Sequence, residues 1–146
     1  MRFIVILAAL ALAACAAQKP AASPSPSPRP VRDPYANGRA IFMTGRDLAG
    51  HRITASRPPL YGSCVQCHRA NGSGGMHLPG GAVSADLRHD ALTKEQDRPY
   101  TLALLERAIS RGVDNDGDKL SPVMPRWQMS QADLRDVAAY VHDKLR

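Results

Sequence analysis

The sequence predicts an all-α domain in which about four short helices are joined by long loops. Residues 35–146 carry few strand signals, and their apolar residues recur at helical spacing in separate segments. The connecting stretches 69–96 and 112–129 are rich in glycine and proline, and loops of this length are uncommon in a self-sufficient helical bundle. We therefore expect something other than side chains to fill the middle of the domain.

The clearest helix is predicted to follow Ser130, because Ser130 and Asp133 form a capping box with aspartate in place of the usual glutamate. One apolar stripe then continues at helical spacing through Leu134, Val137, Ala138, Val141 and Leu145.

Three further helices are predicted upstream. One runs from about Tyr35 to Thr44 around Ile41 and Phe42, and a second starts near Pro59 and carries two cysteines. The third runs from about Asp97 or Pro99 to Arg111, with Gly112 as its stop signal and an apolar side formed by Leu102, Leu105, Ala108 and Ile109.

The N-terminus has the pattern of an export signal. Residues 1–14 combine Arg2 with an apolar run that is too short to span a bilayer, which takes about 20 apolar residues. The stretch Leu12-Ala13-Ala14-Cys15 resembles the lipobox of bacterial lipoproteins, which implies a lipid on Cys15 as the mature N-terminus. The alternative is a signal-peptide cysteine that is lost by cleavage further on.

Residues 15–34 are predicted to be a tether. Proline alternates there with serine and alanine, a composition that favours extended polyproline II, so the sixteen positions 19–34 reach about 50 Å. The folded domain is expected over 35–146.

Loss of Arg2 with the signal segment leaves 18 basic and 13 acidic side chains, a net charge of +5. Such a surface suits an acidic partner protein or an anionic membrane face, whereas scattered arginines in an exported protein do not indicate nucleic acid.

The strongest functional signal is Cys64-Val65-Gln66-Cys67-His68, which fits the C-x-x-C-H attachment signature of c-type haem. Two thiols one helical turn apart can form thioethers with the vinyl groups on one porphyrin edge, and the adjacent imidazole can ligate the iron. A thioredoxin-like site would need a preceding strand, and none is evident. A structural zinc site would need a second pair of ligands, usually cysteines, and there is none. A simple disulfide is the remaining alternative.

The sixth iron ligand decides the chemistry, because a thioether suits electron transfer whereas an open position binds gases or peroxide. We predict Met124, which lies between two prolines in a polar loop 56 residues beyond His68. The competing candidates are Met43, Met76, Met129, His51, His77, His89 and His142.

Residues 35–146 resemble a class I monohaem cytochrome c, on the strength of CVQCH, the glycine-rich loop after it and LSPVMPRWQMSQADLRDVAAYVHDKL. The resemblance implies a class I cytochrome c fold around one covalent haem c. Its attachment residues are Cys64 and Cys67, and its iron ligands are His68 and Met124. It also implies a crossing of the first and last helices, with Gly38 and Phe42 meeting Tyr140; the alternative for Gly38 is a helix-entry glycine.

The resemblance further implies that the carbonyl of Pro79 accepts from His68 Nδ1 and fixes the imidazole. Trp127 is expected to pack at the haem edge or bond a propionate, and ordinary core packing is the alternative. Two features depart from the smallest family members: a loop over residues 45–60 of unassigned role, and an acidic cluster of Asp114, Asp116 and Asp118. The cluster lacks the glycine and glutamate of an EF-hand, so we expect a solvated turn.

The sequence thus predicts a membrane-anchored electron carrier, and no enzyme, on the periplasmic side of a bacterial membrane. We expect a monomer that exchanges electrons with redox proteins of the cell envelope, and no nucleic-acid partner. The rival hypothesis is a haem subunit of a larger oxidoreductase, or a gas- or peroxide-binding protein with a weak sixth ligand.

Overall fold

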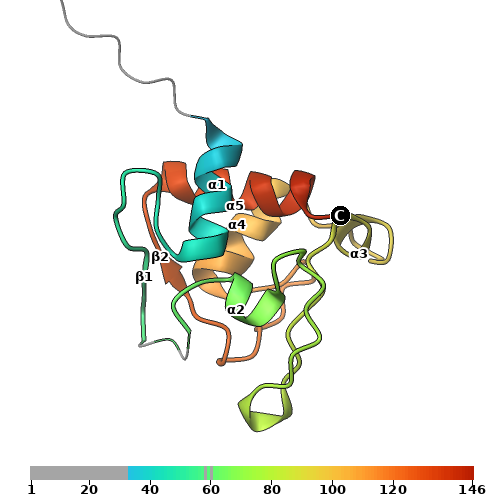
Figure 1. The fold of residues 1–146 in the computed structure, drawn as a ribbon. Coiled ribbons are helices and arrows are strands. Elements are labelled where there is room, and N and C mark those ends of the chain that lie inside the picture. Colours follow the sequence, from blue (N-terminus) through green and yellow to red (C-terminus); the bar gives the residue numbers. More distant parts are fainter. Residues whose placement is uncertain (1–32, 58, 60) are drawn as a thin grey trace, which may run out of the picture. The chain divides into compact units, whose positions relative to one another are not determined.

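The computed structural model describes residues 33–57, 59 and 61–146, and the signal segment, Cys15 and nearly all of the predicted tether lie outside them. The predicted helical class is confirmed in this part of the chain (Figure 1). The elements are α1 (Pro34–Thr44), β1 (Thr54–Ala55), α2 (Val65–His68), the short 3-10 turn η1 (Pro79–Gly81), α3 (His89–Thr93), α4 (Leu102–Arg111), β2 (Trp127–Gln128) and α5 (Gln131–Lys144).

Side-chain caps fix where α1 and α5 begin. The Asp33 carboxylate accepts from the amides of Tyr35 and Ala36, so α1 starts at Pro34, one residue before the predicted boundary. The Ser130 hydroxyl accepts from the Asp133 amide at 3.1 Å, which confirms the predicted start of α5. The whole predicted apolar stripe of this last helix is buried.

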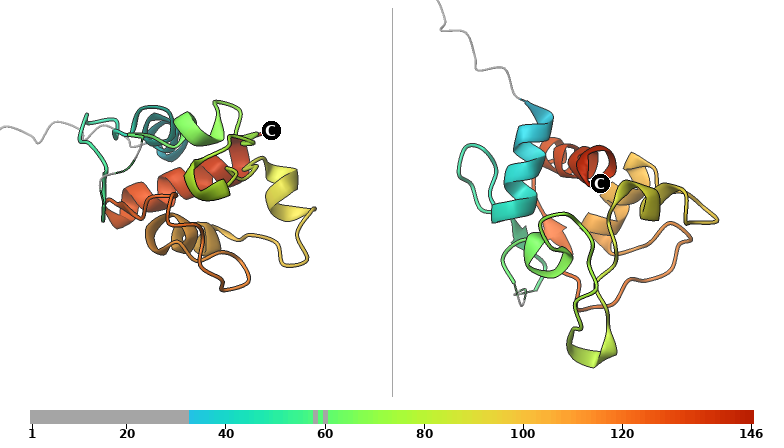
Figure 2. Two further views of the ribbon diagram at one scale, coloured as in Figure 1. Left: turned by 90° about the horizontal axis from the view of Figure 1, so that it is seen from below. Right: turned by 45° about the vertical axis from the view of Figure 1, so that its right-hand side comes forward.

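The contact between α1 and α5 is the most extensive between any two elements in the described residues, and α1 crosses over α5 in Figures 1 and 2. The crossing is close because Gly38 has no side chain: a Cβ there would overlap the backbone carbonyl of Asp136 and lie 2.7 Å from the Cβ of Tyr140. The rings of Phe42 and Tyr140 pack with centroids 5.7 Å apart. The implied roles of Gly38, Phe42 and Tyr140 are therefore confirmed.

The buried side chain of Asn37 joins this crossing to the segment that follows α1. Its Nδ2 donates to Asp133 Oδ1 at 2.9 Å and to Asp136 Oδ2 at 2.8 Å, and its Oδ1 accepts from the Leu48 amide at 2.9 Å. The polar side-chain atoms of Asn37 thus all form hydrogen bonds, which link α1 to α5 and to the segment after α1. These bonds offset the cost of removing the amide from water.

The described residues of the 45–60 segment, whose role the sequence left open, pack beside the loop that carries Met124. Strands β1 and β2 pair antiparallel, with Thr54 opposite Gln128 and Ala55 opposite Trp127. The Ser56 amide extends this pairing by donating to the carbonyl of Arg126 at 3.1 Å. The segment therefore supports the end of the loop that carries Met124.

Helix α4 begins later than predicted. The hydroxyl of Thr101 caps its first turn, and Asn115 Nδ2 donates to the carbonyl of Arg98 at 2.6 Å, which holds that residue in the connection before the helix. Leu105 and Ala108 are buried as predicted and Gly112 ends the helix. Leu102 was predicted to be buried but is 43% exposed. It is the first residue of α4, where the apolar side of the helix reaches the protein surface.

Two short helices differ from the sequence-based expectation. Helix α2 begins at Val65 and not near Pro59, because Oε1 of Gln66 accepts from the amides of Gly62 and Ser63 and holds them in a turn. Helix α3 was not predicted, and its buried Leu92 joins the core. In the described residues, no helix has the length and apolar character needed to cross a bilayer.

Candidate functional site

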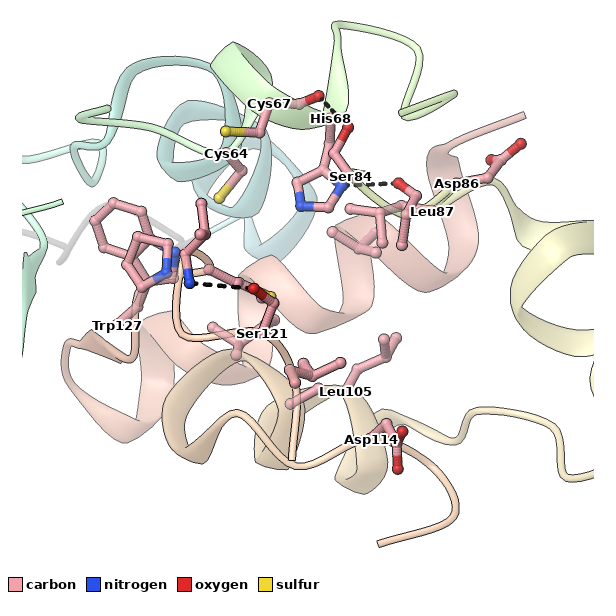
Figure 3. A pocket seen from close by; sticks show the side chains of 18 of the residues that line it. Cys64, Cys67, His68, Ser84, Asp86, Leu87, Leu105, Asp114, Ser121 and Trp127 are labelled. Atoms are coloured by element: carbon pink, nitrogen blue, oxygen red, sulfur yellow. Dashed lines mark hydrogen bonds between the residues drawn. The ribbon is translucent and has the colours of Figure 1, made fainter. Parts of the chain in front are cut away.

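A mostly apolar cavity of about 400 Å³ lies between the cysteine segment and the loop 112–127 (Figure 3). Helix α2 and the hairpin that follows it, in which His77 pairs with Val83, contribute one part of the lining. Helices α4 and α5 and the loop before β2 contribute most of the rest, and α1, α3 and the connection before α4 add a few residues. The members used below are Cys64, Cys67, His68, Ser84, Ala85, Met124 and Trp127. The predicted need for a filling other than side chains corresponds to this cavity.

The sulfur atoms of Cys64 and Cys67 point into the cavity from α2 and the residue before it (Figure 3). They are not joined in a disulfide. Burial raises the pKa of the Cys64 thiol to about 12, and burial also raises the pKa of Cys67. Redox-active cysteine pairs have lowered thiol pKa values, so this environment disfavours a thioredoxin-like site. In the described part of the chain, no three His, Cys, Asp or Glu side chains gather to hold a metal ion.

His68 is buried at the end of α2 with its imidazole directed into the cavity (Figure 3). Its Nδ1 lies 2.9 Å from the carbonyl oxygen of Ala85. A carbonyl can only accept, so Nδ1 carries the proton and Nε2 of the neutral ring keeps a lone pair for a ligand. Burial lowers the pKa of His68, against the raising effect of this hydrogen bond, and so favours the neutral ring that binds metal.

The role implied for Pro79 is wrong. Pro79 is exposed in η1, at the far end of the hairpin that extends away from the helices in Figure 1, and the carbonyl bonded to His68 belongs to Ala85. The supporting bond predicted for the imidazole exists, but its acceptor lies six residues further along the chain. A backbone carbonyl has no side-chain signature, so a family-typical proline was a poor guide to its position.

Sequence reasoning also missed two residues that place the Ala85 carbonyl. The Ser84 hydroxyl donates to the Cys67 carbonyl at 2.8 Å and accepts from the Met76 amide at 2.9 Å, which ties the hairpin to α2. Gly74 has a φ of 59°, and a Cβ there would overlap the carbonyls of Ser84 and Ala85. The glycine-rich stretch after His68 was the available signal, because close backbone approach is one of the few conditions that require glycine.

Met124 is the only one of the eight candidate sixth ligands that lines the cavity. Met43 and Met129 pack against the hydrophobic core, His51 pairs with Asp47, and His89 bonds the carbonyl of His142. The structure therefore brings Met124 and His68 to one cavity and leaves the other candidates elsewhere.

Trp127 lies in β2, is 5% exposed, and belongs both to the hydrophobic core and to the cavity lining (Figure 3). Its position is compatible with haem-edge packing and with core packing, so its hydrogen bond to a propionate stays a prediction. The acidic cluster forms the expected turn: Oδ1 of Asp114 accepts from the amides of Asp116, Gly117 and Asp118, and Asp116 and Asp118 are exposed.

Residues 35–144 match the family model of cytochrome c. The chain belongs to the cytochrome c family. No curated protein matches the sequence. Among solved structures, the oxidised form of SHP, an oxygen-binding cytochrome c, is similar to this cytochrome at 20% identity, with a TM-score of 0.42 and coverage of 73% of this chain and 79% of that one.

Membership of this family implies one covalently bound haem c, and the residues present fit that group. Two thiols and an imidazole with a free nitrogen share one apolar cavity, which is the donor set that covalent attachment of such a group requires, and the thioether residue Met124 lines the same cavity. Cytochrome c domains are generally exported, which agrees with the signal segment predicted from residues 1–14.

Proposed function

We propose that this cytochrome is a lipid-anchored electron carrier whose haem iron is ligated by His68 and Met124, with thioether bonds at Cys64 and Cys67. The observation that supports this most directly is that His68 and Met124 line the same apolar cavity. The haem would supply reversible one-electron chemistry, and a histidine–methionine pair raises its reduction potential.

The protein's own residues would keep this site unchanged between oxidation states. The Ala85 carbonyl holds the His68 ring in one orientation and tautomer, which also makes the imidazole a better donor. Apolar side chains of α4 and α5, such as Leu105 and Val141, would exclude water from the haem faces. Because neither His68 nor Met124 would have to move, little reorganisation would accompany each electron. We propose no bond-making substrate and no catalytic acid, base or nucleophile.

The test of this function is the optical spectrum of the oxidised Met124→Ala variant. We expect the methionine-to-iron charge-transfer band of the wild-type protein to disappear, because the thioether sulfur is removed. Met129→Ala is the matched control, since Met129 is a partly buried methionine five residues further on that packs against the core and does not line the cavity. It should keep the band.

A different outcome supports the rival function. A high-spin spectrum in the wild-type protein that shifts with carbon monoxide, and that Met124→Ala leaves unchanged, would indicate an open sixth position. The protein would then be a gas- or peroxide-binding cytochrome.

We further propose that a lipid on Cys15 attaches the domain to the periplasmic side of a bacterial membrane. The lipobox-like residues 12–15 and the proline-rich stretch after them support this proposal. Expressed from its full gene, the wild-type protein should fractionate with membranes and show a lipid-sized mass increase on its N-terminal peptide. Cys15→Ala should lose both. An unmodified, soluble wild-type N-terminus that starts after Cys15 would exclude the anchor.

The proposed partners are redox proteins of the same compartment. A net charge of +5 after removal of the signal segment supports an acidic partner surface, since complementary charge accelerates encounter. We propose that the protein acts as a monomer. Stable crosslinking into a neighbouring oxidoreductase would instead support the rival function, a haem subunit of a larger complex.

A further inference from the structure

The guanidinium group of Arg126 lies inside the loop that carries Met124. Its Nη1 donates to the carbonyls of Met124 at 2.6 Å and Ser121 at 3.2 Å, and its Nη2 donates to the carbonyl of Leu120 at 2.7 Å. All three acceptors are backbone oxygens of the loop itself. One side chain therefore closes residues 120–126 into a ring through charge-assisted hydrogen bonds, which are stronger than bonds between neutral groups.

Gly112, the C-cap residue of α4, makes room for the Arg126 guanidinium. Gly112 is buried with a φ of 65°, and a Cβ at this position would fall on the carbon and nitrogen atoms of the Arg126 guanidinium. The sequence explains Gly112 as a helix stop, and the structure adds a second reason for glycine. The backbone at the end of α4 thus packs directly against the Arg126 guanidinium of the loop that carries Met124.

The main chain of Arg126 connects the loop to the rest of the fold. Its carbonyl accepts from the Ser56 amide at 3.1 Å, and the next two residues form β2, which pairs with β1. Within the loop, the Met124 amide donates to the Ser121 carbonyl at 3.1 Å, and the Leu120 amide donates to the Gly112 carbonyl at 2.9 Å. Movement of Met124 away from the cavity would have to break bonds that converge on Arg126.

We propose that Arg126 is a positioning residue that holds the 120–126 loop closed and thereby keeps Met124 at the haem iron. This inference rests on the proposed function, because it assigns a role to the side chain that restrains the proposed sixth ligand. Only arginine suits the position: its planar fork reaches three carbonyls from one stem, whereas a lysine ammonium is a compact point charge without that fork.

The experiment measures how readily imidazole displaces the sixth ligand in the oxidised haem protein. We expect Arg126→Gln to raise the affinity for imidazole about ten-fold or more, the change expected from losing even one hydrogen bond to a charged group. Arg111→Gln is the matched control, because Arg111 is an exposed arginine next to Gly112 and the change in charge is the same. Arg126→Lys should fall between the two, and it gives the measurement if Arg126→Gln does not mature.

Amide hydrogen exchange of Leu120 and Met124 gives a second readout that does not depend on the iron. In Arg126→Gln both amides should exchange about ten-fold faster than in Arg111→Gln, because the closed loop loses its central donor. Gly112→Ala should also raise the affinity for imidazole in the wild-type background. In the Arg126→Gln background, the same substitution should raise that affinity much less. The backbone strain at position 112 is common to both backgrounds and cancels in this cycle.

Imidazole affinity and exchange rates that are equal in Arg126→Gln and Arg111→Gln would overturn the proposal. Additive effects of Gly112→Ala and Arg126→Gln would overturn the contact between the two residues. Failure of the proposed function looks different: Met124→Ala would then bind imidazole with wild-type affinity, while the exchange rates would still report whether Arg126 closes the loop.

Discussion

Replacing both Cys64 and Cys67 by alanine is expected to yield a protein without covalently bound haem. The two sulfurs enter the cavity from α2 and from the residue just before it, and no thioether can form without them. The cavity of about 400 Å³ would then lack its filling, and its apolar walls would lose packing. We expect a colourless band after denaturing electrophoresis and a less cooperative thermal transition.

The control for this variant is Gln66→Ala. Gln66 lies between the two cysteines and holds the preceding turn through Gly62 and Ser63, so its removal disturbs the same segment but keeps both sulfurs. Haem absorbance in that band should persist. A double cysteine variant that still carries haem through denaturation would show that the attachment is elsewhere.

The second large effect is expected for Gly38→Val at the crossing of α1 and α5. Valine has the higher helix propensity, so an isolated α1 would gain stability from the change. In the fold, the new side chain meets the Asp136 carbonyl and the Cβ of Tyr140, neither of which is the flexible end of a side chain. We expect a loss of about 3 kcal/mol in the free energy of unfolding, the upper end of the typical range for overpacked cores.

Arg39→Val is the matched control, because position 39 is the next residue of α1 and is exposed. Its effect should stay within about 0.5 kcal/mol, as for surface substitutions away from special features. Chemical denaturation of both haem proteins measures the difference. Equal stabilities would mean that the close approach of α1 and α5 at Gly38 does not hold in solution.

The parts of the fold that the sequence predicted well are those fixed by local signals. Ser130 and Asp133 mark the start of α5, and the spacing from Leu134 to Leu145 identifies its buried face. The cap of Gly112 on α4 is equally local. The crossing at Gly38 is not local, and it was reached through a family resemblance that the geometry then confirmed.

Two errors in the fold, the start of α4 and the missed helix α3, depend on contacts with residues distant in the sequence. Asn115 holds the Arg98 carbonyl and so contributes to the delayed start of α4. Leu92 is buried by tertiary packing in a helix of only five residues, which is too short to show a periodic pattern. Single-sequence patterns do not contain such partners.

The candidate site divides in the same way. One local motif predicts Cys64, Cys67 and His68. The prolines that flank Met124 favour it over Met129 as the sixth ligand, and of the two only Met124 lines the cavity. The residues that orient these groups were not predictable. The acceptors are backbone atoms, namely the Ala85 carbonyl and the three carbonyls bound by Arg126. Every residue has a backbone carbonyl, so residue type does not predict which carbonyl will accept a given hydrogen bond.

The central claim is that one haem is fused to this chain through two sulfurs, and the intact mass of denatured protein tests it most directly. The protein should be matured in a host that is competent for cytochrome c assembly and then treated with a thiol-alkylating reagent. We predict a mass equal to the processed polypeptide with its Cys15 lipid plus one haem, with Cys64 and Cys67 unmodified by the reagent. A colourless protein of polypeptide mass, alkylated at both cysteines, would contradict the account.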